Sequence, residues 1–201
     1  MLSGTDNSTF GNVRGLCARD CYFGPFKFTS EIGTFLDLGA NRGMVSLLAL
    51  SCLGAERAIG VEALENYNGI VQLLLQANHL SPDCAPRYNR FVSSRSSEAR
   101  DPSQNVSIET IRTEQGIDRF GFVKMDIEGG EIDVFRGPDW LVHVDNLAME
   151  VHPSAGDLSI IPAALRDYSF DFVCVDQSGT RRKINDAMFV YASRNRSLRQ
   201  L

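Results

Sequence analysis

Acidic side chains follow buried, strand-like segments of this chain, and that pattern could gather several carboxylates around one ligand. Residues 121–137 read GFVKMDIEGGEIDVFRG, in which apolar residues fit a buried strand and Asp126 stands at its end. Glu128 follows two residues later, and Glu131 opens a helix after a pair of glycines. Three neighbouring carboxylates repel one another and cost desolvation if buried, so folding alone does not account for them. Negative charge is favourable at a helix N-terminus, which explains Glu131 better than Asp126.

Two further candidate catalytic residues lie at the end of the next predicted strand, residues 145–151. Glu150 is its penultimate residue, and His152 follows directly after it. Alternation along a strand places both side chains on one side, so we expect them at the carboxyl edge of the sheet beside Asp126. A histidine has a pKa near working pH and suits a general base. The alternative is a structural His–Glu pair.

The elements that must position these groups begin with residues 35–43, FLDLGANRG. This segment reads as a short buried strand that breaks into a glycine-containing turn, and apolar residues at helical spacing follow it. Strand, tight turn and helix form the geometry by which a doubly wound sheet presents a ligand site. The glycines allow a ligand to approach the backbone, and free N–H groups at the helix start point at it. The alternative is a turn that needs its glycines for steric reasons only.

The turn departs from the dinucleotide fingerprint G-x-G-x-x-G. It contains Gly39, Asn41 and Gly43, with Met44 where the third glycine would fall. The acid that ends the strand, Asp37, is also unlike the usual dinucleotide turn. The pattern D-x-G-x-N-x-G resembles motif I of class I S-adenosylmethionine-dependent methyltransferases. In those enzymes the first-strand acid and the loop surround the methionine part of the cofactor.

A second buried strand, residues 57–62, also ends in an acid, Glu62, which follows Asp37 by 25 residues. This spacing fits one strand–helix–strand unit, with both acids at the carboxyl ends of neighbouring parallel strands. A carboxylate there can accept hydrogen bonds from both hydroxyls of a ribose. Adenosyl cofactors and dinucleotides both offer that diol, so Glu62 supports either ligand.

The composition limits the classes of partner. The chain has 201 residues, 43% of them hydrophobic and 22% charged, which suits one ordinary globular domain. The formal net charge of −5 argues against nucleic acid as the main partner. No apolar run is long enough for a membrane span, and the N-terminus lacks the features of a signal peptide. Five cysteines at scattered spacings do not suggest a disulfide framework, so we expect a cytoplasmic protein.

The remaining pattern alternates helices and strands. We expect helices over residues 67–77, 107–115 and 160–167, a third strand over 87–92 and a surface loop over 93–106. Residues 170–175 and 187–193 are predicted as two strands joined by a hairpin loop.

Residues 1–31 are predicted to be an N-terminal extension or lid, and residues 32–201 the main domain. The first segment is polar and punctuated by glycine, but it carries an aromatic group: Tyr22, Phe23, Phe26 and Phe28. These rings could pack against the edge of the domain or close over a ligand site.

The stretch K-M-D-I-E-G-G-E, with Phe-Arg-Gly after it, resembles the hallmark of the FkbM-type methyltransferases. The resemblance extends over about residues 35–152, with a tail to 193. It implies an α/β fold of the Rossmann-like class I type, a doubly wound, mostly parallel sheet of seven strands with an antiparallel terminal strand. It also implies S-adenosyl-L-methionine as cofactor, S-adenosyl-L-homocysteine as product, and a hydroxyl group as the usual acceptor.

The resemblance assigns cofactor binding to the first-strand acid, the turn, the ribose-binding acid and the fourth-strand acid: Asp37, Gly39, Ala40, Asn41, Gly43, Glu62 and Asp126. Lys124 belongs to the fourth-strand motif and could offset one of its acids. The candidate catalytic residues are His152, Glu150, Asp126 and Glu128, with the general base near the ends of strands four and five.

A divalent cation held by Asp126, Glu128, Glu150 and His152 would suit Mg or Mn. We do not favour this site, because helix capping and binding of the cofactor amine already account for some of the acids.

The expected reaction is in-line O-methylation of a small molecule or sugar, without nucleic acid or membrane as partner. The acceptor and the oligomeric state cannot be read from the sequence. Two alternatives stay open: a non-catalytic module that binds an adenosyl cofactor, and a dinucleotide-dependent oxidoreductase.

Overall fold

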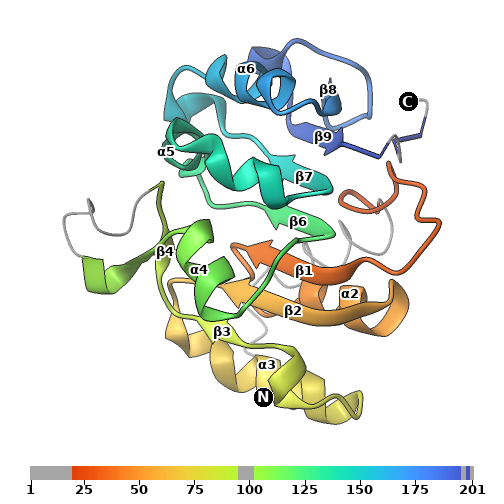
Figure 1. The fold of residues 1–201 in the computed structure, drawn as a ribbon, viewed down its shortest axis with the longest axis vertical. Coiled ribbons are helices and arrows are strands. Elements are labelled where there is room, and N and C mark those ends of the chain that lie inside the picture. Colours follow the sequence, from red (N-terminus) through yellow and green to blue (C-terminus); the bar gives the residue numbers. More distant parts are fainter. Residues whose placement is uncertain (1–19, 95–101, 196–197, 200–201) are drawn as a thin grey trace.

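The computed structural model describes residues 20–94, 102–195 and 198–199. Its centre is a seven-stranded sheet in the order β3-β2-β1-β6-β7-β9-β8 (Figure 1). The strands are β1 (Gly33–Leu38), β2 (Ala55–Val61), β3 (Arg87–Tyr88), β6 (Phe122–Met125), β7 (Asn146–Glu150), β8 (Asp171–Val175) and β9 (Phe189–Ser193). The pairs from β3 to β7 are parallel, and β9 runs antiparallel to both of its neighbours. The predicted fold class is confirmed.

The central strands are buried on both faces, which explains their nearly continuous apolar sequences. Successive side chains point to opposite faces, so each strand contributes to two cores. Leu36, Val123 and Leu147 belong to the core on one face, while Phe35 and Phe122 belong to the core on the other.

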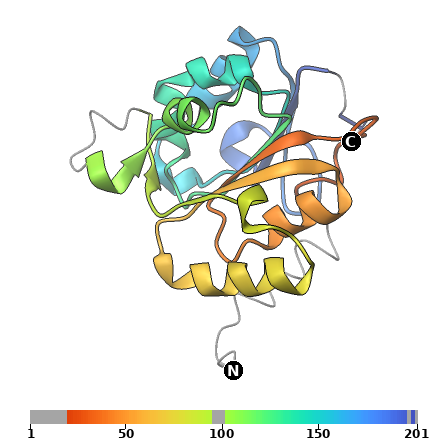
Figure 2. The ribbon, with the colours of Figure 1, turned by 60° about the horizontal axis from the view of Figure 1, so that its bottom comes forward.

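Helices cover both faces (Figure 2). On the side of Leu36, the core is closed by α4 (Ile108–Glu114), α5 (Glu131–Arg136) and α6 (Ile160–Asp167). On the side of Phe35, it is closed by α2 (Met44–Cys52) and by the segment before β1. The helix α3 (Asn68–Ala77) packs on α2 through the cluster of Val71, Leu75 and Leu50.

The described part of the N-terminal segment is packed into the domain. Tyr22, Phe23 and Phe26 are buried, and the rings of Phe23 and Phe26 lie 5.1 and 4.9 Å from that of Phe122. Packing of the aromatic group, as the sequence suggested, is therefore observed. A boundary at residue 31 and a lid function stay predictions, and residues 1–19 lie outside the described part of the chain.

The predicted third strand over 87–92 is wrong in its length. The structure divides it into β3 and β4 (Phe91–Val92), and β4 pairs with β5 (Asn105–Val106) in a separate two-stranded sheet. The chain leaves the main sheet at Asn89, whose side-chain amide donates to the carbonyl of Glu62 at 3.2 Å and to Asn68 at 3.3 Å. The Asn89 side chain thus donates to a backbone carbonyl just beyond β2, at the point where pairing between β2 and β3 would otherwise have continued. The predicted loop over 93–106 consequently ends in a strand, and its residues 95–101 lie outside the described part.

The other predicted elements are confirmed to within one or two residues. Short 3₁₀ helices complete the connections: η2 (Glu65–Tyr67), η3 (Pro82–Cys84), η5 (Pro102–Gln104), η6 (Pro138–His143), η7 (Pro153–Ala155) and η8 (Ile184–Asp186). No helix in the described ranges has the length and apolar character needed to cross a bilayer.

Candidate functional site

A cavity of ≈ 1010 Å³ opens at the carboxyl edge of the parallel strands. Its walls come from the turn between β1 and α2, the ends of β2, β6 and β7, the segment before β1, and the loop between β8 and β9. This is the edge at which open α/β sheets bind ligands. The predicted site residues in its lining are Gly39, Ala40, Asn41, Glu62, Asp126, Glu128 and Glu150. Asp37, Gly43 and His152 lie outside the lining.

The turn after β1 is held against the end of β6. Gly39 has a φ of +77°, and a Cβ added there would lie 1.7 Å from the backbone oxygen of Asp126. The backbone amides of Gly39 and Ala40 both donate to the carbonyl of Val61 at 2.9 Å. Asn41, in the left-handed region at φ 46°, completes the turn. The glycine is therefore required by close approach of two backbone segments, and the turn leaves its own backbone on the cavity wall.

Glu62 lies where the sequence predicts a ribose-binding acid, at the end of β2. One carboxylate oxygen accepts from the backbone amide of Asn41 at 2.9 Å, and the other accepts from that of Leu64 at 3.0 Å. Arg87 ties the same turn down by donating to the carbonyl of Asn41 at 2.9 Å. Each oxygen of an ionised carboxylate has a second lone pair, so Glu62 keeps acceptors for a ligand while its orientation is fixed.

Asp37 lies behind the cavity wall and contacts it through Lys124. The Asp37 carboxylate is fully buried, accepts from the Ser46 hydroxyl at 2.6 Å and pairs with the Lys124 ammonium at 3.3 Å. The two residues are register partners on β1 and β6, which places their side chains on the same face. Lys124 donates onward to the carbonyl of Gly39 at 2.8 Å. Asp37 thus holds the lysine that fixes the turn, and a direct contact to a cofactor stays a prediction.

Asp126 is held by a residue from the N-terminal segment. The Tyr22 hydroxyl donates to Asp126 Oδ2 at 3.1 Å, and the Lys124 ammonium lies 3.9 Å from the same oxygen. Burial, followed by the charge of Asp126, raises the pKa of Tyr22, so its hydroxyl remains a donor. This contact is not predicted from the sequence. The aromatic group marked Tyr22 as unusual, but no local pattern relates two residues separated by 104 positions.

Glu150 ends β7 and lines the cavity. Burial raises the pKa of its carboxyl to about 7, and the charge of Asp126 adds to the effect. The positive charge of His152 opposes the shift. A carboxyl with a pKa near neutrality can exchange a proton with a bound ligand at working pH.

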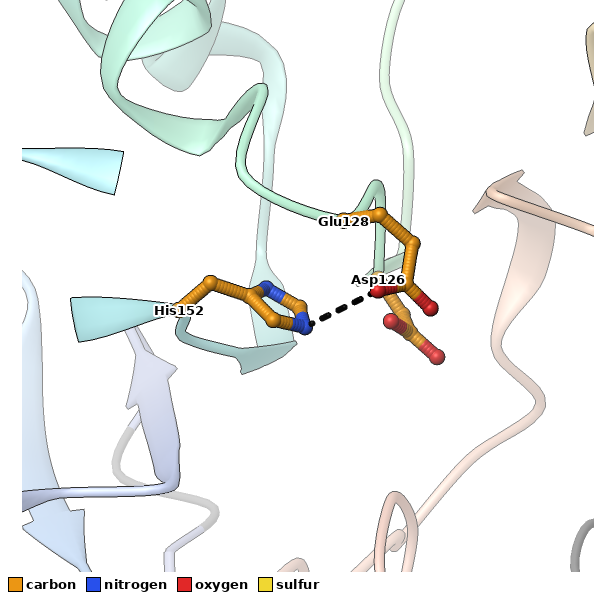
Figure 3. A group of neighbouring side chains, drawn as sticks. All are labelled: Asp126, Glu128 and His152. Carbon is orange, nitrogen blue, oxygen red and sulfur yellow. Dashed lines mark ion pairs between the residues drawn. The ribbon is translucent and has the colours of Figure 1, made fainter. Parts of the chain in front are cut away.

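His152 follows β7 and lies between two glutamates. Its Nδ1 is 3.0 Å from Oε1 of Glu131, and its Nε2 is 3.6 Å from Oε2 of Glu128 (Figure 3). Burial lowers the pKa of His152, but the charges of Glu131 and Glu128 outweigh it, and the net shift is upward. Glu131 is fully buried. The sequence explains Glu131 by the preference for negative charge at a helix N-terminus, and in the structure its carboxylate contacts the histidine.

The structure therefore brings Asp126, Glu128 and His152 together, with one ligand atom of each within 4.8 Å of the others. Glu150 lies on the cavity wall near them, as expected for the end of β7. The assignment of catalytic and cofactor-binding roles to these residues stays a prediction.

The sequence model of the family described as "Methyltransferase FkbM domain" matches residues 37–172. No match was found among curated proteins.

Several solved structures share the fold. The methyltransferase FkbM from Methylobacillus flagellatus KT gives a TM-score of 0.60 at 19% identity, covering 82% of this chain and 44% of that one. The ribosomal protein L11 methylase from Lactobacillus delbrueckii subsp. bulgaricus gives 0.50 at 13% identity, covering 83% and 72%. TrmK from M. capricolum, in complex with S-adenosyl-homocysteine, gives 0.50 at 7% identity, covering 84% and 65%. These likenesses establish the fold alone, and the chain spans less than half the length of the FkbM structure.

Proposed function

This chain belongs to the FkbM family of S-adenosylmethionine-dependent methyltransferases, and we propose that it methylates a hydroxyl group of a small molecule or sugar. The observation that carries the proposal is one cavity whose wall contains both Glu62, an acceptor for a ribose, and Glu150, an acceptor for a proton. A hydroxyl nucleophile loses its proton as it attacks a methyl group, so a carboxyl with a pKa of about 7 suits this reaction.

The residues on one side of the cavity fit the cofactor. Glu62 offers free lone pairs to the two ribose hydroxyls, and the turn from Gly39 to Asn41 offers a backbone that a ligand can approach closely. The backbone of Asp126 contacts this turn, and Asp126 lines the cavity, where its carboxylate can accept from the amino group of the methionine part. The complex of TrmK with S-adenosyl-homocysteine supports a cofactor of this kind on this fold.

Bound S-adenosylmethionine supplies an electrophilic methyl group on a sulfonium. The chain then has two tasks: to hold the acceptor oxygen in line with the methyl–sulfur bond, and to take its proton. We assign the proton to a carboxylate oxygen of Glu150, because this residue lines the cavity and His152 does not. His152, whose Nδ1 is engaged by Glu131, is the second candidate for the base.

Binding is tested first, by thermal shift with S-adenosylhomocysteine and with NAD as separate ligands. We expect S-adenosylhomocysteine to raise the melting temperature by mass action and NAD to leave it unchanged. Glu62→Gln should lose most of this rise. Glu56→Gln, an equal change of charge at an exposed position on β2, should keep it. Stabilisation by NAD alone would remove the methyltransferase assignment for this chain.

Catalysis is tested by incubating the protein with S-adenosylmethionine carrying a deuterated methyl group and a library of hydroxylated compounds, with mass spectrometry of the products. Glu150→Gln should retain the thermal shift with S-adenosylhomocysteine and lose about 10²–10⁴-fold in turnover. Full turnover in this variant would exclude Glu150 as the base. Labelled products on nitrogen or carbon only would overturn the proposed acceptor class.

A further inference from the structure

The turn after β6 and the segment after β7 contribute three residues to a cluster beside the cavity. Asp126 and Glu128 come from the turn, His152 lies two residues beyond β7, and one atom of each lies within 4.8 Å of the others. Figure 3 shows the imidazole directed at the two carboxylates. Asp126 and Glu128 also line the cavity, so the cluster borders the space in which a substrate would bind.

The two ring nitrogens of His152 make different contacts. His152 Nδ1 is 3.0 Å from Glu131, which is a hydrogen bond, whereas Nε2 is 3.6 Å from Glu128, which is too long for one. Two ligand atoms bound to one ion at about 2.1 Å are about 3.0–3.4 Å apart at angles between square and tetrahedral. A contraction of a few tenths of an ångström would therefore place His152 and Glu128 on one ion.

Glu131 fixes which nitrogen of His152 faces the carboxylates. It is fully buried, and its Oε1 lies 3.0 Å from Nδ1, so Nε2 is the nitrogen directed at Glu128. A buried carboxylate that holds the outer nitrogen of a histidine is the usual support of a metal-binding imidazole. The second oxygen of Glu131 is also buried and has no hydrogen-bond partner among the described residues.

The local charge also favours a cation. Lys124 lies 3.9 Å from Asp126, but its closer partner is Asp37 at 3.3 Å, so one ammonium is shared between two carboxylates. The two carboxylates of the cluster therefore bring more negative charge to this place than Lys124 balances, and a bound cation would offset it.

We propose that Asp126, Glu128 and His152 bind a divalent cation of the Mn²⁺ type, with Glu131 as the residue that positions His152. One imidazole nitrogen and two carboxylate oxygens suit Mn²⁺ better than Mg²⁺, which favours oxygen ligands and retains its water. Three protein ligands leave coordination positions open. The ion can bind in the absence of the cofactor, whereas its use to hold an acceptor hydroxyl rests on the proposed function, in which Asp126 offers one carboxylate oxygen to the ion and the other to the cofactor amino group.

The test is titration of the full chain, first stripped with a chelator, with Mn²⁺ alone. Free Mn²⁺ is followed by electron paramagnetic resonance. We expect one Mn²⁺ per chain. Glu128→Gln should weaken binding at least tenfold, and this variant should fold normally, because the Glu128 side chain is 87% exposed. Glu131→Gln should weaken binding about 10–100-fold without removing a ligand. The control Glu56→Gln changes an exposed residue at the start of β2, away from the carboxyl edge of the sheet, and should bind Mn²⁺ as the wild type does.

Equal Mn²⁺ affinity in Glu128→Gln and Glu56→Gln, or no binding by the wild type, would overturn the proposal. His152 would then form an ion pair with its glutamates only. Thermal shift with S-adenosylhomocysteine in the same samples separates this result from failure of the proposed function. A chain that binds Mn²⁺ as described but does not respond to S-adenosylhomocysteine keeps the metal site and loses the methyltransferase proposal. The reverse result loses the metal site alone.

Discussion

Replacing Gly39 with alanine should damage both stability and cofactor binding. The φ of +77° is in the left-handed region, which costs a residue with a Cβ about 1–2 kcal/mol. The new Cβ would also lie 1.7 Å from the backbone oxygen of Asp126. Since both atoms belong to or adjoin the backbone, no rotamer change relieves the overlap. Overpacking of this kind costs about 1–3 kcal/mol, so the total is about 2–5 kcal/mol.

Two other glycines separate the strain from the overlap. Gly33 and Gly116 have φ of +60° and +62°, and a Cβ on either would meet nothing within 4 Å. Gly33→Ala and Gly116→Ala should therefore cost only the backbone term of about 1–2 kcal/mol. The reduced entropy of the unfolded chain affects all three variants alike. Gly39→Ala should exceed these controls by about 1–3 kcal/mol, which corresponds to about 2–12 °C in melting temperature for a chain of this size.

The measurement is urea unfolding of the three variants, with thermal shift by S-adenosylhomocysteine as a second readout. Movement of the turn away from Asp126 should also displace Asn41 from Glu62, so Gly39→Ala should lose the ligand response that the two controls retain. If the unfolding free energy of Gly39→Ala lies within about 0.5 kcal/mol of those of Gly33→Ala and Gly116→Ala, steric overlap with Asp126 does not destabilise the turn.

Three further predictions concern charged and polar groups of the site. Burial and the charge of Asp126 raise the pKa of Glu150 from 4.5 to about 7. The folded protein therefore keeps a proton that the unfolded chain loses, and its free energy of unfolding falls as pH rises from about 4.5 to about 7. Glu150→Gln should remove this loss; melting temperatures at pH 4.5 and 8 that differ as much in the variant as in the wild type would contradict it. Lys124→Met leaves the buried Asp37 without its counter-charge and should cost about 3–5 kcal/mol in urea unfolding, with partial recovery in Lys124→Met/Asp37→Asn. Tyr22→Phe removes the donor to Asp126 and should cost about 1.5–3 kcal/mol; an unchanged unfolding curve would show that this hydrogen bond is not formed in solution.

The parts of the site that the sequence predicted are those encoded by short patterns. Glu62 and the turn at Gly39 follow from strand–turn–helix periodicity and from the spacing of acids at strand ends. The same reasoning placed Glu150 at the end of β7. These inferences succeeded because parallel strands present their carboxyl ends at one edge, whatever the packing of the rest of the chain.

The parts that could not be predicted depend on contacts between distant residues. Nothing near Asp37 in the sequence shows that its carboxylate is directed at Lys124, and nothing near Tyr22 shows that it reaches Asp126. Strands of two residues, such as β4, are too short to have a measurable period. Strand alternation placed His152 on one side of the strand, but the pairing of its Nδ1 with Glu131 depends on packing of α5.

The position of β9 between β7 and β8 has a consequence for synthesis of the chain. Strands β1, β2, β3, β6 and β7 can pair with one another as soon as residue 150 has left the ribosome, and only the β9 side of β7 then lacks its partner. In the described sheet β8 contacts β9 alone, so it has no partner until residues 189–193 have been made. Until then the growing chain carries an open strand edge on β7, the kind of surface on which nascent chains aggregate or recruit chaperones. Slow translation between codons 175 and 189 should therefore reduce the yield of native protein more than an equal delay earlier in the message.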